Sequence, residues 1–126
     1  MAIQSAMERV KAAKQEVENL TPQQVAEEMK KDKVVIVDIR EANELEETGK
    51  ISGSVHAPRG LLEFYADPAH SYHKSELKDD KRIILHCASG GRSALAAQTL
   101  KQMGYTNVAH MDGGMKAWKE NNLPVE

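Results

Sequence analysis

Two short runs of apolar, mostly β-branched residues constrain the fold of this chain more than any other feature. The first, residues 33–40 (KVVIVDIR), ends in charged residues, and the second, residues 82–87 (RIILHC), stops abruptly at a cysteine. Runs of this length without polar alternation are typical of strands that are covered on both faces. We therefore expect a central sheet with a layer of helices on each side.

Helical patterns surround these two runs. In residues 3–19 the apolar side chains recur every three or four positions, which predicts a first helix. Thr21, Pro22 and Gln24 form an N-cap, a first-turn proline and a capping-box partner, so a second helix should begin at Pro22. Further helices are predicted over residues 93–104 and over residues 115–122.

The order of these segments predicts the architecture. Residues 107–111 (NVAHM) form a plausible further strand, and residues 49–80 are interpreted as a short strand with an extended loop. Strands that alternate with helices indicate an α/β fold with a mainly parallel central sheet flanked by helices. Ligands of such folds bind beyond the carboxyl ends of the strands, and Cys87 follows the second run directly.

Composition excludes several functional classes. The 126 residues include 17 basic and 19 acidic side chains spread along the chain, so we expect no nucleic-acid partner and no membrane partner. Cys87 is the single cysteine, which suits a reducing compartment, and we expect a cytoplasmic protein. The histidines include one His-x-x-His pair without recognisable ligand partners, so no metal site is predicted. The residues do not define an oligomeric state.

The segment from Cys87 to Ser93 (CASGGRS) carries the strongest chemical signal. Gly90 and Gly91 let consecutive backbone N–H groups turn inward as an anion-binding nest, and the helix that follows adds its positive dipole end. Arg92 adds a full positive charge. All three effects favour a thiolate, which is a nucleophile. The alternative is that Cys87 is an inert buried residue at the end of a strand.

Four separated stretches resemble the rhodanese (thiosulfate sulfurtransferase) homology domain. They are LTPQQVAEEM, VVIVDIREANELEETGKISGSVHAP, HCASGGRSALAA and MDGGMKAW, and they occur in the family's order. The resemblance covers residues 20–126 and leaves residues 1–19 as an N-terminal helical extension. The chain departs from the common pattern at Lys50, Ser52 and His56, which we expect to affect the conformation of one turn and the donor preference. It also departs at Met111, where we expect a change in packing.

The resemblance implies a role for each residue of the site. Cys87 would accept sulfane sulfur as a persulfide, and Arg92 would help to hold an anionic donor. The substrate-binding loop would consist of Ala88, Ser89, Gly90, Gly91, Arg92 and Ser93. Supporting roles fall to Asp38, Arg40, Gly113 and Gly114. The alternative for Asp38 and Arg40 is that they are ordinary solvated charges at the end of a strand.

The implied reaction is a sulfur transfer in two half-reactions that need no metal and no cofactor. A small anionic donor such as thiosulfate would load Cys87, and a thiophilic acceptor such as cyanide, a thiol or a protein cysteine would unload it. One alternative is a phosphatase, whose signature loop has five residues between cysteine and arginine, whereas this chain has four. The others are a non-enzymatic regulatory module and a persulfide carrier that is loaded by another protein.

The segment of residues 61–73 gathers Leu61, Leu62, Phe64, Tyr65 and Tyr72. Core packing is its default interpretation, and a pocket wall or a partner surface are the alternatives. His86 precedes the cysteine, but on a strand its side chain should point to the opposite face, so we do not expect it to act as a general base.

Overall fold

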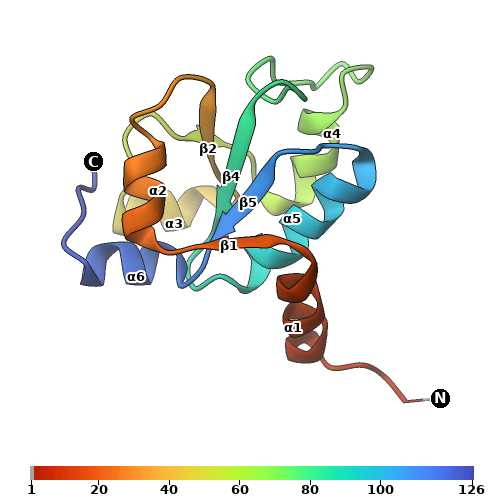
Figure 1. The fold of residues 1–126 in the computed structure, drawn as a ribbon, viewed down its shortest axis with the longest axis horizontal. Helices are drawn as coiled ribbons and strands as arrows, with labels where there is room; N and C mark the ends of the chain where they lie inside the picture. Colours follow the sequence, from red (N-terminus) through yellow and green to blue (C-terminus); the bar gives the residue numbers. More distant parts are fainter. Residues whose placement is uncertain (1) are drawn as a thin grey trace.

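The computed structural model describes residues 2–126 and contains a five-stranded parallel sheet between two layers of helices (Figure 1). The strands are β1 (Glu18–Leu20), β2 (Val34–Asp38), β3 (Val55–His56), β4 (Arg82–His86) and β5 (Val108–Met111). Their order in the sheet is β1-β5-β4-β2-β3, and every pair is parallel. The predicted α/β fold with a mainly parallel sheet is confirmed.

The helices divide between the two faces of the sheet. They are α1 (Ala6–Glu16), α2 (Pro22–Glu28), α3 (Ala42–Thr48), α4 (Leu62–Ala66), α5 (Gly91–Met103) and α6 (Gly114–Glu120), with a short 3-10 turn, η1 (Arg59–Leu61), before α4. In Figure 1, α2, α3 and α6 lie on one side of the sheet and α1, α4 and α5 on the other. No helix within residues 2–126 has the length and apolar character that crossing a bilayer requires.

Alternating side chains of the central strands supply two cores. Ile83 and Leu85 of β4 pack toward α5 together with Leu100, whereas Ile84 faces the other side with Met111 and Trp118. All six of these core residues are at most 2% exposed. Because both faces of β4 are covered, consecutive residues of the strand are apolar.

The capping box that was predicted for the second helix is present. Thr21 Oγ1 accepts a hydrogen bond from Gln24 N at 3.2 Å, and Gln24 Oε1 accepts one from Thr21 N at 2.8 Å. The last two predicted strands and the last two predicted helices are also found, with ends shifted by one or two residues.

The prediction of one helix over residues 3–19 is wrong at its C-terminal end. The helix ends at Glu16, and Glu18–Leu20 form an edge strand that pairs with β5. Val17 and Leu20 fit the helical spacing, but Val17 is the extended C-cap of α1 and Leu20 lies in β1, and they are buried in the cores on the two faces of the sheet. Pairing with β5 therefore overrides the helical pattern.

Residues 49–80 were interpreted as a short strand with an extended loop; the strand is present as β3, but the remainder also holds η1 and α4. Leu62 and Ala66 of α4 are fully buried, whereas Phe64 and Tyr72 are 44% and 58% exposed. Residues 61–73 thus contribute both core packing and exposed aromatic surface. Helix α3 was not predicted either, because its sequence (ANELEET) has no apolar stripe and no buried residue.

Candidate active site

Cys87 lies directly after β4, at the carboxyl edge of the sheet, where its backbone turns into the loop that starts α5. The residue is 1% exposed, and its side chain belongs to the core on the α5 side. Gly90 caps α5 with a φ of 104°, a left-handed conformation that glycine adopts without strain. The chain can therefore fold back over the sulfur within three residues.

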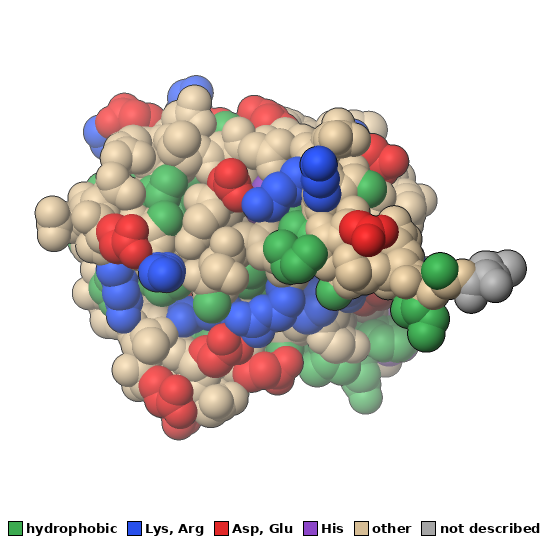
Figure 2. Space-filling view, turned by 90° about the horizontal axis from the view of Figure 1, so that it is seen from below, with side chains coloured by type: hydrophobic (Ala, Val, Ile, Leu, Met, Phe, Trp, Pro, Cys, Tyr) green, Lys and Arg blue, Asp and Glu red, His purple; other side chains and the backbone are tan. Residues whose placement is uncertain are grey.

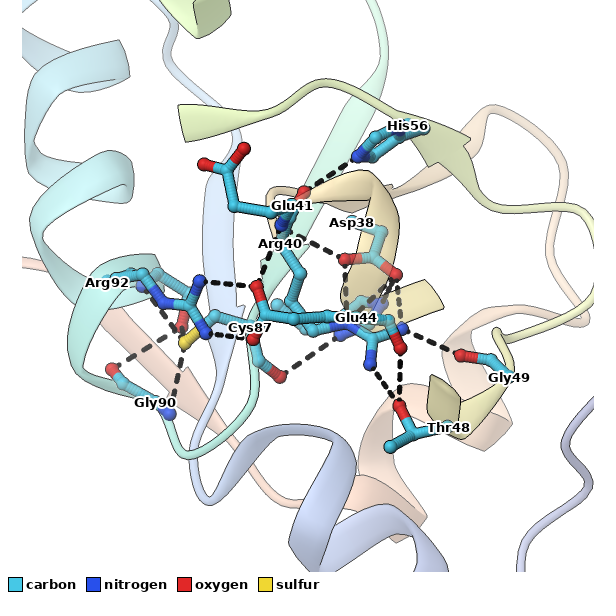
Figure 3. A network of polar contacts seen from close by, with 12 residues as sticks. Asp38, Arg40, Glu41, Glu44, Thr48, Gly49, His56, Cys87, Gly90 and Arg92 are labelled. Carbon is cyan, nitrogen blue, oxygen red and sulfur yellow. Dashed lines mark hydrogen bonds and ion pairs between the residues drawn. The ribbon is translucent and has the colours of Figure 1, made fainter. Parts of the chain in front are cut away.

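Two backbone N–H groups donate hydrogen bonds to the sulfur. Gly90 N lies 3.1 Å from Cys87 Sγ (Figure 3). Ser93 N lies 3.4 Å from the same atom. Gly90 is the N-cap of α5, a helix of 13 residues, and Ser93 lies in its first turn, so the positive end of the helix dipole faces the sulfur. This arrangement stabilises negative charge on the sulfur, on a thiolate or on a persulfide.

The other loop residues are spread between the interior and the surface. Ser93 is fully buried, with its hydroxyl 3.5 Å from Cys87 Sγ, whereas Ser89 is exposed. Ala88, Gly91 and Arg92 are half-buried. The structure therefore brings Gly90 and Ser93 to the sulfur by hydrogen bonds, and it places Ser89 on the solvent side of the loop.

The guanidinium of Arg92 is held by a carboxylate. Its two terminal nitrogens donate to Glu44 of α3 at 2.9 and 2.8 Å (Figure 3). The hydrogen bond from Arg92 lowers the pKa of Glu44 to about 2, so this carboxylate is ionised at neutral pH. The sequence did not identify Glu44 as a site residue, because it lies 48 residues before Arg92 and meets it only in the folded chain. The charge of Arg92 is thus already paired in the resting site.

Asp38 and Arg40 form a buried ion pair beside the loop. Arg40 is 2% exposed and donates to both carboxylate oxygens of Asp38, with Arg40 Nη2 at 2.8 Å from Asp38 Oδ2. It also donates to Thr48 Oγ1 and to the Gly49 carbonyl, which ties the C-terminal end of α3 to the end of β2. The interpretation of Asp38 and Arg40 as solvated charges is therefore wrong.

The pKa of Asp38 reflects these contacts. Burial alone would raise the pKa of this carboxyl, but the hydrogen bonds from Arg40 and the neighbouring charges hold it below its ordinary value. An ionised carboxylate at the end of β2 keeps Arg40 fixed, and Arg40 in turn positions α3 and Glu44.

The turn at Gly113 and Gly114 packs against the back of the loop. Met115 N and Lys116 N donate to the carbonyls of Cys87 and Ala88 at 2.8 and 3.0 Å. A Cβ atom on Gly114 would lie 2.5 Å from Cys87 O and from the carbonyl carbon of Ala88. This close approach requires glycine.

His86 does not contact the sulfur. Its ring is fully buried, its Nε2 lies 3.7 Å from Asp38 Oδ2, and burial lowers its pKa. His110, in contrast, is hydrogen-bonded to Ser93 at 2.9 Å, next to the sulfur. Sequence reasoning gave His110 no role, because nothing in the local pattern of β5 connects it with the loop 20 residues earlier.

The surface around the loop carries charges of both signs. A cavity of about 220 Å³ borders Ala88 and is lined by Arg40, Glu44, Glu47, Thr48, Ala88, Met115 and Lys119. Figure 2, which views this end of the molecule, shows basic and acidic side chains side by side. A ligand that approaches the loop meets a mixed field rather than a uniformly positive one.

Comparisons with known proteins match most of the chain to one family. Residues 21–121 match the family model of the rhodanese-like domain. A sulfurtransferase from Allochromatium vinosum is 33% identical over 92 residues, which cover 73% of this chain and 78% of that protein. The thiosulfate sulfurtransferase GlpE from Glaesserella parasuis is 32% identical over 85% of this chain and 91% of its own length.

One solved structure and one further sequence relative are also similar to this chain. A protein of unknown function from Rhodopseudomonas palustris, RPA3614, described as a possible tyrosine phosphatase, superimposes with a TM-score of 0.93 at 39% identity, covering 100% of this chain and 97% of that chain. The match to the uncharacterised protein YqhL of Bacillus subtilis, at 36% identity, covers 68% of this chain and spans 61% of that relative. With its parallel sheet, its loop around Cys87 and a family match over most of its length, the chain belongs to the rhodanese-like domain family.

Proposed function

We propose that the protein is a sulfurtransferase in which Cys87 carries sulfane sulfur as a persulfide. The observation that supports this most is the pair of N–H groups, from Gly90 and Ser93, that point at Cys87 Sγ. Such donors stabilise a sulfur anion before and after it accepts a second sulfur atom. The sulfurtransferases among the relatives support the same chemistry.

The proposed reaction has two steps. In the first, the Cys87 thiolate attacks the outer sulfur of a donor such as thiosulfate; a new S–S bond forms, and sulfite leaves with the electron pair of the broken bond. In the second, a thiophilic acceptor such as cyanide or a thiol attacks the outer sulfur of the persulfide and releases the Cys87 thiolate. The loop from Ala88 to Ser93 encloses the carried sulfur in both states.

Steady-state kinetics test this function. With thiosulfate and cyanide both varied, the double displacement predicts parallel double-reciprocal lines and complete loss of transfer in Cys87→Ser. Intersecting lines, or a Cys87→Ser variant that still transfers sulfur, would contradict the mechanism. The folded state of the variant is checked by its thermal unfolding.

The second candidate is a persulfide carrier that is loaded by another protein. It is favoured by the pairing of Arg92 with Glu44, which leaves less positive charge for a small anionic donor. Glu44→Gln removes the competing charge, so a site built for anionic donors should show a KM for thiosulfate that is lower by about threefold or more. An unchanged KM together with efficient loading from a persulfidated protein would favour the carrier.

A phosphatase is the remaining candidate, because RPA3614 is described as a possible tyrosine phosphatase. Four residues separate Cys87 from Arg92, one fewer than in the phosphatase signature, and Arg92 already pairs with Glu44. We therefore expect no hydrolysis of p-nitrophenyl phosphate that depends on Cys87.

The single thiol suits a reducing compartment, and we propose the cytoplasm as the location of the protein.

A further inference from the structure

His110 is a fully buried titratable residue beside the active-site loop that the proposed reaction does not yet use. It lies on β5, and both ring nitrogens have partners. Its Nδ1 is 2.9 Å from Ser93 Oγ, and its Nε2 is 2.6 Å from Asn19 Oδ1. With the 3.5 Å contact between Ser93 Oγ and Cys87 Sγ, these bonds form a continuous chain from the sulfur to β1.

The side-chain amide of Asn19 fixes the tautomer of His110. Asn19 Nδ2 donates to the carbonyls of Lys14 and Val17 at 2.9 and 3.0 Å, which occupies both of its hydrogens. The amide oxygen must therefore face His110, and an oxygen of this kind only accepts. His110 Nε2 carries the hydrogen in this bond, so Nδ1 of the neutral ring is a free acceptor.

This tautomer sets the direction of the Ser93 hydroxyl. Ser93 has one hydroxyl hydrogen, and His110 Nδ1 at 2.9 Å is a better acceptor than the Gly90 carbonyl at 3.4 Å. The hydrogen therefore points at the ring, and an oxygen lone pair faces Cys87 Sγ. A Cys87 thiol donates its proton to that lone pair.

Among the groups that contact the sulfur, the Ser93 hydroxyl is the one that can accept the thiol proton. The Gly90 and Ser93 N–H groups can donate but cannot accept, and Cys87 is 1% exposed. Within residues 2–126, the Ser93 hydroxyl is the acceptor that lies within hydrogen-bond distance of Sγ. A proton that leaves the thiol must therefore pass to Ser93 Oγ.

We propose that His110 is a positioning residue for Cys87 that receives the thiol proton through Ser93 and returns it later in the cycle. The S–H bond of Cys87 breaks as a new O–H bond forms on Ser93, and the original Ser93 hydrogen moves to His110 Nδ1. The electron pair stays on the sulfur, and Ser93 remains neutral. When an acceptor removes the outer sulfur of the persulfide, the proton returns along the same path.

The charges around His110 make it a temporary proton holder. Burial lowers the pKa of His110 to about 4, Asp112 opposes that shift, and Lys14 adds to it. Lys14 and Asp112 are themselves paired at 2.8 Å, so their effects on the ring largely cancel. An imidazolium that is disfavoured by burial gives its proton back readily, as a reversible cycle requires.

The test uses alkylation of Cys87 by iodoacetamide, followed by intact mass between pH 5 and pH 9. Both His110→Phe and Ser93→Ala should alkylate ~10-fold or more slowly at neutral pH, with the midpoint of the rate profile moved to higher pH. The matched control is His73→Phe, a half-buried histidine bonded to the Leu77 carbonyl, whose profile should equal that of the wild-type protein.

An unchanged midpoint in Ser93→Ala, or a shift to lower pH in either variant, would overturn the inference. If His110→Phe does not fold, Ser93→Ala carries the test. Nitrogen NMR of the wild-type protein provides a second readout, since donation from His110 Nε2 to Asn19 Oδ1 requires the hydrogen on Nε2. A hydrogen on Nδ1 would contradict the inference. The inference rests on the proposed function, but alkylation uses no sulfur donor. A normal profile with normal persulfide formation would sink only the inference, and a shifted profile without persulfide would sink only the proposed function.

Discussion

The sulfur of Cys87 is held mainly by backbone groups, so the conformation of a few residues decides the geometry of the site. Gly114 is the clearest example of a residue whose backbone conformation affects the site. It adopts a φ of 60°, and its backbone lies against the carbonyls of Cys87 and Ala88. Because the neighbouring atoms are backbone, they cannot move aside without displacing the loop.

Gly114→Ala should therefore damage both stability and the site. We expect a loss of ~2 kcal/mol or more in the free energy of unfolding, measured in urea, with slower alkylation of Cys87. Gly53→Ala is the control, because Gly53 has a similar φ of 80° but no atom within 4 Å of the added Cβ. Equal losses in the two variants would show that the close approach to the loop has no effect of its own.

At the scale of elements, helix α1 and strand β1 connect the N-terminal residues to the site. Val10 and Ala13 of α1 pack on Ala94 of α5, and β1 adds an edge to the sheet through β5. Asn19, in β1, holds the ring of His110. The segment that the family resemblance leaves outside the domain thus contacts α5, the helix that follows Cys87 and the first residues of the active-site loop.

This packing yields a test by overpacking. Ala13→Leu inserts a larger side chain between α1 and α5 and should cost about 1–3 kcal/mol in the free energy of unfolding. Ala12→Leu places the same side chain on the exposed face of the same helix and should leave stability nearly unchanged. If both variants were equally stable in thermal unfolding, α1 would not be docked as described.

The elements also show which features sequence alone can predict. The central strands, α2, α5 and α6 have local signals: β-branched runs, a capping box, and glycines at helix ends. Strand β1 and helix α4 do not, because β1 depends on pairing with β5 and α4 depends on the burial of Leu62 and Ala66 in the core on the α5 side. In the site, the loop from Cys87 to Ser93 is contiguous and therefore visible, whereas Glu44 and His110 reach it only through the fold.

At the scale of the whole molecule, buried histidines make stability depend on pH. The pKa of His110 is about 4 in the folded protein against an ordinary value of 6.5, and burial lowers the pKa of His86 as well. Between these two pH values the unfolded chain binds more protons than the folded one, so stability falls as the pH decreases. Asp38, Glu44 and Asp112, whose pKa values are also lowered, add a further loss at more acidic pH.

Urea unfolding at several pH values checks this dependence. From pH 6.5 to pH 4 the free energy of unfolding should decrease, with an upper bound of about 3 kcal/mol from His110. His110→Phe should show a shallower decrease, which His86 maintains together with Glu44, whose pKa is lowered from an ordinary value of 4.5. A stability that stays flat or rises over this range would contradict the neutral, buried state of both rings.

Intact-mass spectrometry shows whether Cys87 carries sulfur. The purified protein is incubated with thiosulfate, then with cyanide, beside Cys87→Ser. The account predicts the gain of one sulfur atom with thiosulfate, its loss with cyanide, and no gain in the variant. An adduct that persists in Cys87→Ser, or a wild-type protein that gains no sulfur from thiosulfate or from a persulfidated protein, would contradict it.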